Sequence, residues 1–438
     1  MMSARLFAAG LLLALVQPAL GQEVRVQLGA DLLFSERIDL VKGKKIGLLT
    51  NHTALLSDGR HLADVLTGRD DMELVALFGP EHGIRGDTTG PIRDGVDPAT
   101  GVPVYSLYGK TKKPTARMLE GLDLILFDVQ DVGARFYTYI STMGHVMGAA
   151  AKKKIPFVVL DRPNPITGAR VEGPVAEDSM LSIMVPVKPK PTAGATVEGP
   201  VAVDSTLSLV TFAPIPIMHG MTVGELAMMY NGQGYLEDSV RAHLTVVRMK
   251  NWTRDLWYDE TGIQWVNPSP NMLTLRTALV YPGTCLFEGV NVSEGRGTDK
   301  PFEYIGAPWL NTVQVIELLE NASLPGVKFE PIQFTPTKRP KNVTAPKFTK
   351  QGCNGIRIEV TEREEYQAVR TGIVLLWAIR MIHPERLEWK GKTFDLLAGT
   401  TIVRSMLERG RTPDQVIASW NESLQAFKEV RQKYLLYP

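Results

Sequence analysis

The stretch from Met72 to Gly86, M-E-L-V-A-L-F-G-P-E-H-G-I-R-G, limits the possible folds of this chain more than any other. It contains an uncharged apolar run, residues 74–78, which is typical of a strand buried on both faces of a parallel sheet. Gly79-Pro80 ends this run, and polar residues follow at once. Ligands of open α/β sheets bind outside the carboxyl ends of the strands. We therefore expect a functional site here, with Glu81 as its first candidate residue.

Segments typical of strands and helices alternate from Gly43 onward. The predicted strands cover residues 45–50, 74–78, 122–129 and 155–160, the predicted helices cover 60–66 and 139–154, and a helical turn is predicted at 115–120. A strand–helix–strand succession implies right-handed crossovers and a parallel sheet. The sequence therefore predicts an α/β fold.

Each of the four predicted strands is followed by polar residues. These are Asn51-His52, Glu81-His82, Asp128 with Gln130 and Asp131, and Asp161-Arg162 with Asn164. Because the carboxyl ends of parallel strands share one edge of a sheet, we expect these side chains to face one crevice.

The length of 438 residues suits two domains. We expect a signal peptide at 1–21, a catalytic domain at 22–248 and a smaller mixed α/β domain at 249–438 that completes the cleft. A strand at 355–360 and a helix at 364–382 belong to the smaller domain.

Balanced charge, 48 Lys+Arg against 47 Asp+Glu, argues against a nucleic-acid partner. No apolar run after residue 21 is long enough for a membrane span in the mature chain.

The N-terminus resembles a secretory signal peptide. Arg5 precedes an apolar stretch at residues 6–16, and Ala19-Leu20-Gly21 is a small-x-small cleavage site. An uncleaved anchor is the alternative, but the run is short for a span. We expect an exported protein, periplasmic or extracellular. Export permits a disulfide between Cys285 and Cys353, although two buried thiols remain an equal alternative.

An internal repeat follows the last predicted strand end. Residues 165–182 recur at 191–208 with an offset of 26 residues, and each copy carries V-E-G-P, with Glu172 in the first and Glu198 in the second. Two copies are too few for a solenoid, so a duplicated loop is the better interpretation.

Several of these side chains have both a chemical and a structural interpretation. Glu81 in a partly desolvated crevice could act as a general acid or base, or it could cap the next turn or pair with Arg85. Arg135 could be the partner that a buried Asp131 or Asp128 needs.

Tyr137 and Tyr139 offer faces for a sugar ring but suit a core equally. Arg296, between two glycines, could bind a carboxylate or merely contact Glu294.

Other classes of site lack their signatures. There is no G-x-G-x-x-G after the first strand, no Walker A loop, no G-x-S-x-G elbow and no H-E-x-x-H. Two distant cysteines without suitably spaced histidines do not form a metal cluster. We therefore expect neither a metal nor another cofactor.

Long motifs in this chain resemble the NamZ family of exo-β-N-acetylmuramidases, formerly an uncharacterised-domain family. They include G-L-L-T-N, F-G-P-E-H-G-I-R-G, F-D-V-Q-D-V-G-A-R-F-Y-T-Y, L-D-R-P-N-P, H-G-M-T-V-G-E-L, P-S-P-N-M and E-G-R-G-T-D-K-P-F-E. The resemblance implies a Rossmann-like N-terminal domain with the active site in a cleft. It also implies release of N-acetylmuramic acid from non-reducing ends of peptidoglycan fragments, without metal or nucleotide. The proposed catalytic glutamate of the family matches Glu81. The family pattern has one V-E-G-P segment, so the copy that takes its place, with Glu172 or with Glu198, stays open.

Glycoside hydrolysis is therefore the predicted reaction, with Glu81 as catalytic acid/base and Asp128 or Asp131 assisting. Retaining, inverting and substrate-assisted routes all stay open. We expect Arg296 or Arg135 to bind the lactyl carboxylate of muramic acid. The full set of predicted substrate-binding residues is Asn51, His82, Arg85, Gln130, Arg135, Tyr137, Tyr139, Asp161, Arg162, Asn164, Asn271, Glu294 and Arg296. The alternatives are a non-catalytic cell-wall sugar-binding protein and an amide or ester hydrolase of the envelope.

Overall fold

The structure is a computed structural model that describes residues 25–86, 93–109, 111–181, 210–338 and 345–438. The predicted signal peptide and the second copy of the repeat, with Glu198, lie outside the described residues.

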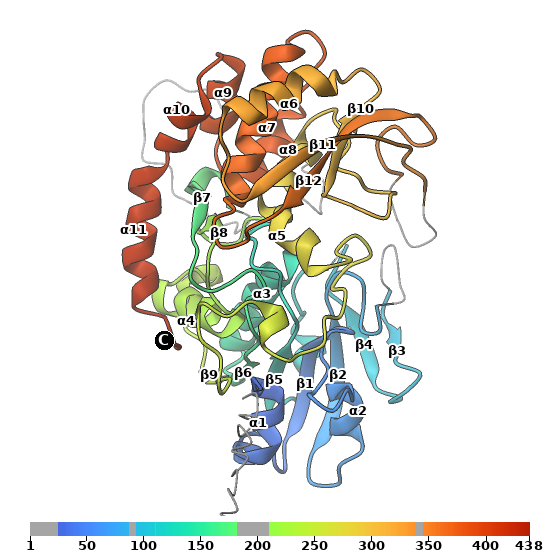
Figure 1. The fold of residues 1–438 in the computed structure, drawn as a ribbon. Helices are drawn as coiled ribbons and strands as arrows, with labels where there is room; N and C mark the ends of the chain where they lie inside the picture. Colours follow the sequence, from blue (N-terminus) through green and yellow to red (C-terminus); the bar gives the residue numbers. More distant parts are fainter. Residues whose placement is uncertain (1–24, 87–92, 110, 182–209, 339–344) are drawn as a thin grey trace, which may run out of the picture.

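A seven-stranded sheet forms the lower half of the molecule (Figure 1). Its strands are β1 (Lys45–Thr50), β2 (Glu73–Gly79), β3 (Gly95–Val96), β4 (Pro103–Ser106), β5 (Leu124–Asp128), β6 (Phe157–Leu160) and β9 (Leu244–Val247). The strand order is β3-β4-β2-β1-β5-β6-β9, and every neighbouring pair is parallel except β3–β4. From β1 the chain builds outward through β2 to β4 and then returns to place β5 on the other side of β1. The topological switch point therefore lies between β1 and β5.

Helices cover both faces of this sheet. The bounds are α1 (Gly29–Ser35) and α2 (Leu62–Thr67) on one face and α3 (Thr138–Lys152) and α4 (Val223–Gln233) on the other. Within β5, Leu124 and Leu126 pack on the α1/α2 face, whereas Ile125 and Phe127 pack on the α3 face. All five residues of β5 and all four of β6 are buried. Two covered faces explain why these strands are continuous apolar runs.

The predicted elements of this half are confirmed. The helix boundaries expected from the pattern, 60–66 and 139–154, differ from α2 and α3 by two residues or fewer. The helical turn predicted at 115–120 is present as a short 3₁₀ turn, Arg117–Leu119. A capping box at Thr222 and Glu225 begins α4, because each side chain accepts a hydrogen bond from the backbone N–H of the other.

The C-terminal half contains a smaller antiparallel sheet, in the order β10-β12-β11, packed against helices (Figure 1). Its elements are α5 (Leu275–Thr284), β10 (Tyr304–Ala307), α6 (Thr312–Asn321), β11 (Val327–Phe334), β12 (Cys353–Val360), α7 (Ala368–Ile382), α8 (Gly391–Ala398), α9 (Ile402–Glu408), α10 (Pro413–Ala418) and α11 (Asn421–Gln432). Cys285 and Cys353 are both buried and free, so the possible disulfide between them does not form. The second of the two alternatives, buried thiols, is correct.

The first copy of the repeat forms β7 (Glu172–Val175), which pairs with β8 (Pro216–Met218) between the two halves. Glu172 accepts a hydrogen bond from the backbone N–H of Val369, in the first turn of α7. One apolar core extends from the large sheet through β8 to α7, so the halves share their interior. The division at residues 248/249 stays a prediction.

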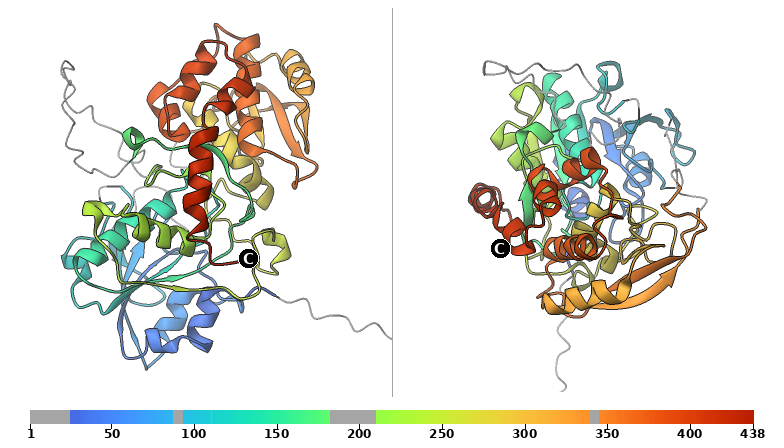
Figure 2. Two further views of the ribbon diagram at one scale, coloured as in Figure 1. Left: turned by 90° about the vertical axis from the view of Figure 1, so that its left-hand side faces the viewer. Right: turned by 90° about the horizontal axis from the view of Figure 1, so that it is seen from above.

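The last helix returns the chain to the large sheet. Figure 2 shows α11 running down the outside of the molecule from the C-terminal half to the edge near β9. Tyr437 ends this path, and its hydroxyl donates to Asp161 and accepts from the backbone N–H of Met249. Among the helices of the described ranges, none has the length and apolar character that crossing a membrane requires.

Candidate active site

Glu81 lies directly after β2, half-buried at the carboxyl edge of the large sheet. The hydroxyl of Thr138, the first residue of α3, donates to its Oε2 at 2.9 Å. Within the described residues Oε1 receives no hydrogen bond. Arg85 does not pair with Glu81. Sequence reasoning missed Thr138, although a hydroxyl residue in a first helical turn is a recognisable signal.

The loop after Glu81 has an unusual backbone. His82 has φ 73°, a region that non-glycine residues seldom occupy, and such strain often concentrates at functional sites. A Cβ on Gly86 would lie 2.4 Å from the ring of His52, so only glycine fits there. The ring Nε2 of His52 is in turn 2.8 Å from the carbonyl of Asn267. His52, absent from the predicted binding set, thus connects the loop of Glu81 to the loop at 267–271.

The tyrosines after β5 lie beneath this site. Tyr137 and Tyr139 pack edge-to-face with ring centroids 4.9 Å apart, and the Tyr139 hydroxyl donates to the carbonyl of Pro268 at 2.5 Å. Only 8% and 1% of these side chains are exposed. Of the two interpretations of Tyr137 and Tyr139, a face for a sugar ring and a core position, their burial supports the core position. They support the 267–271 loop, in which the predicted contact Asn271 is half-buried.

Arg296 approaches the same region from the C-terminal half. Its side chain is 32% exposed, its Nη2 donates to Glu288 at 2.5 Å, and its guanidinium lies over the ring of Phe302. Although burial opposes it, the charge of Glu288 and that of Glu294 raise the pKa of Arg296. Burial lowers the pKa of His82, against the charge of Glu81. The charge of Arg296 makes a smaller contribution to the lowering of the His82 pKa.

Glu294 is held inside this cluster and does not face a ligand. Lys347 donates to it at 2.8 Å, and 4% of the residue is exposed. Burial opposes its ionisation, but the charges of Lys347 and Arg296 lower the pKa of Glu294. Glu288 was the partner of Arg296 that the sequence did not reveal.

Asp128 and Arg162 form a buried ion pair at the ends of β5 and β6. Arg162 Nε and Nη2 donate to the two carboxylate oxygens of Asp128 at 2.5 and 3.0 Å, and the side chains are 3% and 0% exposed. Because both oxygens of Asp128 bind this guanidinium, the expectation that Asp128 assists catalysis is not supported. The sequence had paired the acids of this strand with Arg135 instead, which is wrong.

Arg135 stabilises the fold. Its guanidinium donates to the carbonyls of Pro174, Ile215 and Leu397, and 1% of the residue is exposed. Burial lowers its pKa to about 9. A side chain enclosed in this way cannot reach the carboxylate of a ligand, so of the two arginines expected to bind it, Arg296 and Arg135, the structure does not support Arg135.

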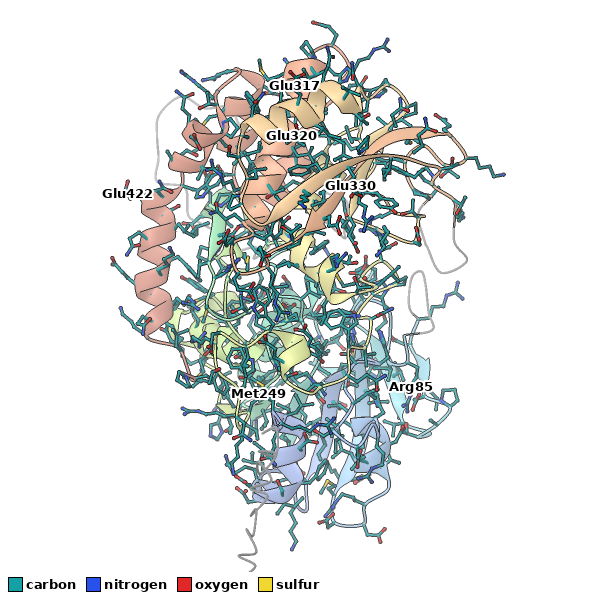
Figure 3. The ribbon with its side chains drawn as sticks, viewed as in Figure 1. Arg85, Met249, Glu317, Glu320, Glu330 and Glu422 are labelled. Atoms are coloured by element: carbon teal, nitrogen blue, oxygen red, sulfur yellow. The ribbon has the colours of Figure 1, made fainter. Side chains whose placement is uncertain are left out.

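Four other predicted contacts have structural partners. Asp161 accepts from Thr222, Gly224 and Tyr437; Asn164 joins Met221 to Ile166; Asn51 accepts from Thr53; and Arg85 binds Asp64 and Asp97. The first three are buried. Arg85, labelled in Figure 3, is partly exposed, but both of its faces are taken by carboxylates. These residues hold the sheet edge together, and a substrate contact is not supported for them.

Asp131 is a buried carboxyl next to this edge. Its Oδ2 accepts from the backbone N–H of Gly133 and lies 3.9 Å from Nε2 of His219. Burial raises the pKa of Asp131 to about 7, so the group holds its proton well above the range of an ordinary aspartate.

This shifted titration predicts a pH-dependent stability. A carboxyl with a raised pKa in the folded chain contributes stability below its ordinary pKa of 3.8, and the contribution is lost as the pH rises through about 7. Asp131→Asn removes this loss. We expect the free energy of unfolding of the variant, relative to wild type, to increase from about pH 4 to about pH 8 in urea titrations. An identical difference at both pH values would contradict the assignment.

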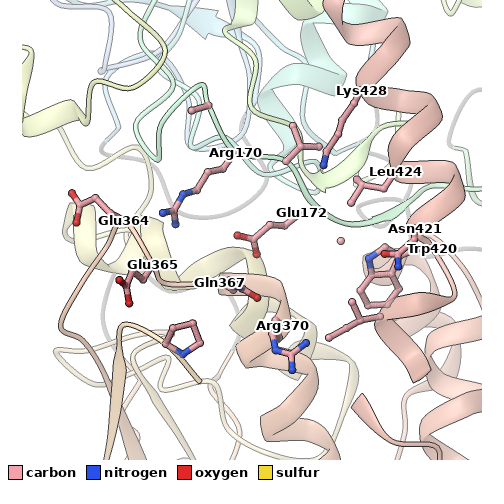
Figure 4. A pocket seen from close by; sticks show the side chains of 15 residues that line it. Arg170, Glu172, Glu364, Glu365, Gln367, Arg370, Trp420, Asn421, Leu424 and Lys428 are labelled. Atoms are coloured by element: carbon pink, nitrogen blue, oxygen red, sulfur yellow. The ribbon is translucent and has the colours of Figure 1, made fainter. Parts of the chain in front are cut away.

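Two cavities lie near the strand ends and between the halves. The larger, about 680 Å³, is bounded by β7, the start of α7 and α11, with Glu172 at its centre and Trp420 on one wall (Figure 4). Burial raises the pKa of Glu172 to about 7. The smaller, about 240 Å³, is lined by Thr53, Gln130 and Arg162. Glu81 lines neither cavity. Within the described ranges there is no cluster of three or more potential metal-ligating side chains.

Comparison with known proteins identifies matching families. The family models described as exo-beta-N-acetylmuramidase NamZ match the N-terminal part at residues 46–188 and 180–276 and the C-terminal part at 279–437. The two N-terminal pieces overlap within the repeat, as expected for a duplicated segment.

Relatives cover nearly the whole chain. The peptidoglycan beta-N-acetylmuramidase NamZ of Bacillus subtilis (strain 168) is 44% identical over 419 residues, 94% of this chain and 92% of the relative. Two crystal structures of DUF1343 family proteins from Bacteroides fragilis NCTC 9343 are each 32% identical. They superpose with TM-scores of 0.82 and 0.72 over 95% and 94% of this chain, and over 100% and 99% of their own chains.

Proposed function

This chain belongs to the NamZ family of exo-β-N-acetylmuramidases and is a glycoside hydrolase, and from that premise we propose that it releases N-acetylmuramic acid from the non-reducing ends of peptidoglycan fragments. We propose Glu81 as the catalytic acid/base. We also propose that the chain is exported and works in the periplasm or outside the cell. Neither alternative, a sugar-binding protein or an amide or ester hydrolase, fits membership of this family.

One observation supports the role of Glu81 above the others. One oxygen of its carboxyl is fixed by Thr138, while the other receives no hydrogen bond within the described residues. A general acid must be held in position and yet have an oxygen free to give a proton to the leaving group. Burial lowers the pKa of the neighbouring His82, so this ring is neutral at pH 7. It therefore does not form an ion pair with the carboxylate of Glu81.

There are two candidates for the second catalytic group. Asp131 is the remaining acid of the predicted pair, and its raised pKa means that it holds a proton near pH 7. The alternative is attack by the N-acetyl group of the substrate itself, for which a single carboxyl at the site is sufficient. The pH dependence of turnover by Asp131→Asn distinguishes the routes, because only the first requires titration of Asp131.

Arg296 is proposed to bind the lactyl carboxylate that distinguishes muramic acid from glucosamine. Its Nη1 donates no hydrogen bond to a described residue, and a guanidinium binds a carboxylate strongly. We expect Arg296→Ala to weaken binding of a muramic glycoside by about 1.5–3 kcal/mol, the range for a hydrogen bond to a charged group. Inhibition constants for N-acetylmuramic acid and N-acetylglucosamine give the measurement. An unchanged preference for the muramic sugar in the variant would refute the role.

Turnover of a chromogenic N-acetylmuramic acid glycoside by the purified mature protein tests the function. The proposal requires release of the chromophore by wild type. Absence of any release, with an intact fold shown by circular dichroism, would overturn it.

A further inference from the structure

The cavity of about 240 Å³ lies at the carboxyl ends of three adjacent parallel strands. Thr53 follows β1, Gln130 follows β5 and Arg162 follows β6, and the fourth wall is the segment 258–266. The cavity thus lies at the switch point between β1 and β5, the place where ligands bind in doubly wound sheets. Val266 borders the cavity, and its neighbour Asn267 binds His52 beside the Glu81 loop.

Gln130 lines this cavity and has one side-chain acceptor without a hydrogen-bond partner in the described part of the chain. Its Nε2 donates to the carbonyls of Asp131 and Pro163 at 2.9 and 2.8 Å. Because carbonyls only accept, this arrangement determines which side-chain atom is nitrogen and which is oxygen. The Oε1 is then buried without a partner among the described residues, and 2% of the residue is exposed. A buried acceptor of this kind carries a cost that a ligand donating to it would remove.

Arg162 supplies the complementary donor. Its Nε and Nη2 bind Asp128, and Nη2 also donates to the carbonyl of Leu55. Its Nη1 makes no hydrogen bond to any described residue, and Arg162 lines the cavity although 97% of its side chain is buried. The carboxylate of Asp128 neutralises the guanidinium.

These two groups select the chemistry of a ligand. A phosphate or carboxylate would direct negative charge at Gln130 Oε1 and would meet an arginine already paired with Asp128. A neutral group that carries an N–H beside a C=O satisfies both atoms, since the N–H donates to Gln130 and the C=O accepts from Arg162. The apolar side chains of Leu55, Leu56 and Ile263 border the same space and suit a methyl group.

We propose that this cavity binds the acetamido group of an N-acetylated hexosamine, with Gln130 Oε1 and Arg162 Nη1 as its hydrogen-bonding partners. The identification of the sugar rests on the proposed function, because both sugars of peptidoglycan carry this group. Gln130 and Arg162 were both among the residues that the sequence predicted to contact substrate, but the sequence did not indicate which of their atoms would do so.

The test compares two neutral sugars that differ only at C2, where N-acetylglucosamine carries the acetamido group and glucose carries a hydroxyl. N-acetylglucosamine and glucose are titrated by calorimetry into wild type, Gln130→Met and Ile263→Trp. The first variant removes the acceptor. The second fills the cavity with a larger side chain and leaves Gln130 and Arg162 in place. We expect wild type to favour N-acetylglucosamine by about tenfold or more, the factor that one lost hydrogen bond explains, and both variants to lose this preference.

Controls separate binding from folding and from catalysis. Val313→Trp places the same bulky side chain at an exposed position on α6, where 71% of the valine is accessible, and must leave the preference unchanged. The midpoint of thermal unfolding shows whether Gln130→Met is folded; if it is not, Ile263→Trp decides alone. Equal binding of the two sugars by wild type, no binding of either, or an unchanged preference in Ile263→Trp overturns the proposal. Failure of wild type to hydrolyse a muramic glycoside would remove the proposed function but leave this titration interpretable.

Discussion

Glu81→Gln is expected to lower kcat on a muramic glycoside by a factor of about 10² to 10⁴, the range in which a positioned general acid or base contributes. The amide keeps the shape of the side chain and can still accept a hydrogen bond from Thr138, so the site should stay intact. What is lost is the proton that the leaving oxygen needs. KM is expected to change much less than kcat, because the substitution removes an interaction made in the transition state.

A matched control lies at the other end of the same strand. Glu73 begins β2, where 64% of its side chain is exposed, and Glu73→Gln should leave kcat unchanged. Thr138→Val tests the positioning of the carboxyl and is expected to reduce kcat less than Glu81→Gln does. If Glu81→Gln retains wild-type kcat, the proton must come from another group and the proposed mechanism is wrong.

Arg162→Met is expected to destabilise the protein by about 3–5 kcal/mol, the usual cost of leaving one member of a buried ion pair without its partner. Asp128 would then be a fully buried carboxylate without its guanidinium, and Leu55 would lose its hydrogen bond. Urea unfolding monitored by tryptophan fluorescence gives the free energy.

The double variant Asp128→Leu/Arg162→Met removes both charges together and should regain a large part of the loss. Lys113→Met interrupts the exposed pair with Glu237 and should change stability little, because surface ion pairs contribute little. If Arg162→Met lowers the free energy of unfolding as little as Lys113→Met does, the buried pair does not stabilise this edge of the sheet.

The large sheet could be predicted from the sequence because its information is local. Residues 74–78 form an apolar run closed by Gly79-Pro80, and such a run with such an end has few other interpretations. The choice of Glu81 as the candidate site residue followed from the same reasoning, because ligands of open α/β sheets bind at the carboxyl ends of the strands. Its partner Thr138 comes from an element 57 residues later, and nothing local connects the two.

The roles of the arginines could not be predicted, because they depend on distant partners. Arg162 and Arg85 stand in loops rich in glycine or proline, as ligand-binding arginines do, yet each is bound by carboxylates from other segments. Arg135 binds carbonyls separated from it by up to 262 residues. Pairing across such separations is a property of the folded chain, and a short pattern does not contain it. The choice between the two repeat copies had the same limit, because V-E-G-P is identical in both.

Arg135 has a consequence for how the molecule can be divided. One guanidinium binds the carbonyl before β8, a carbonyl of β7 and a carbonyl in the last turn of α8, so it connects the two halves of the molecule at a single interior point. A cut between the two family matches would expose that charge on the N-terminal fragment and would expose apolar surface on both fragments. We therefore expect both halves to be required for a folded enzyme. A truncated N-terminal piece should be insoluble and should not work as a smaller enzyme.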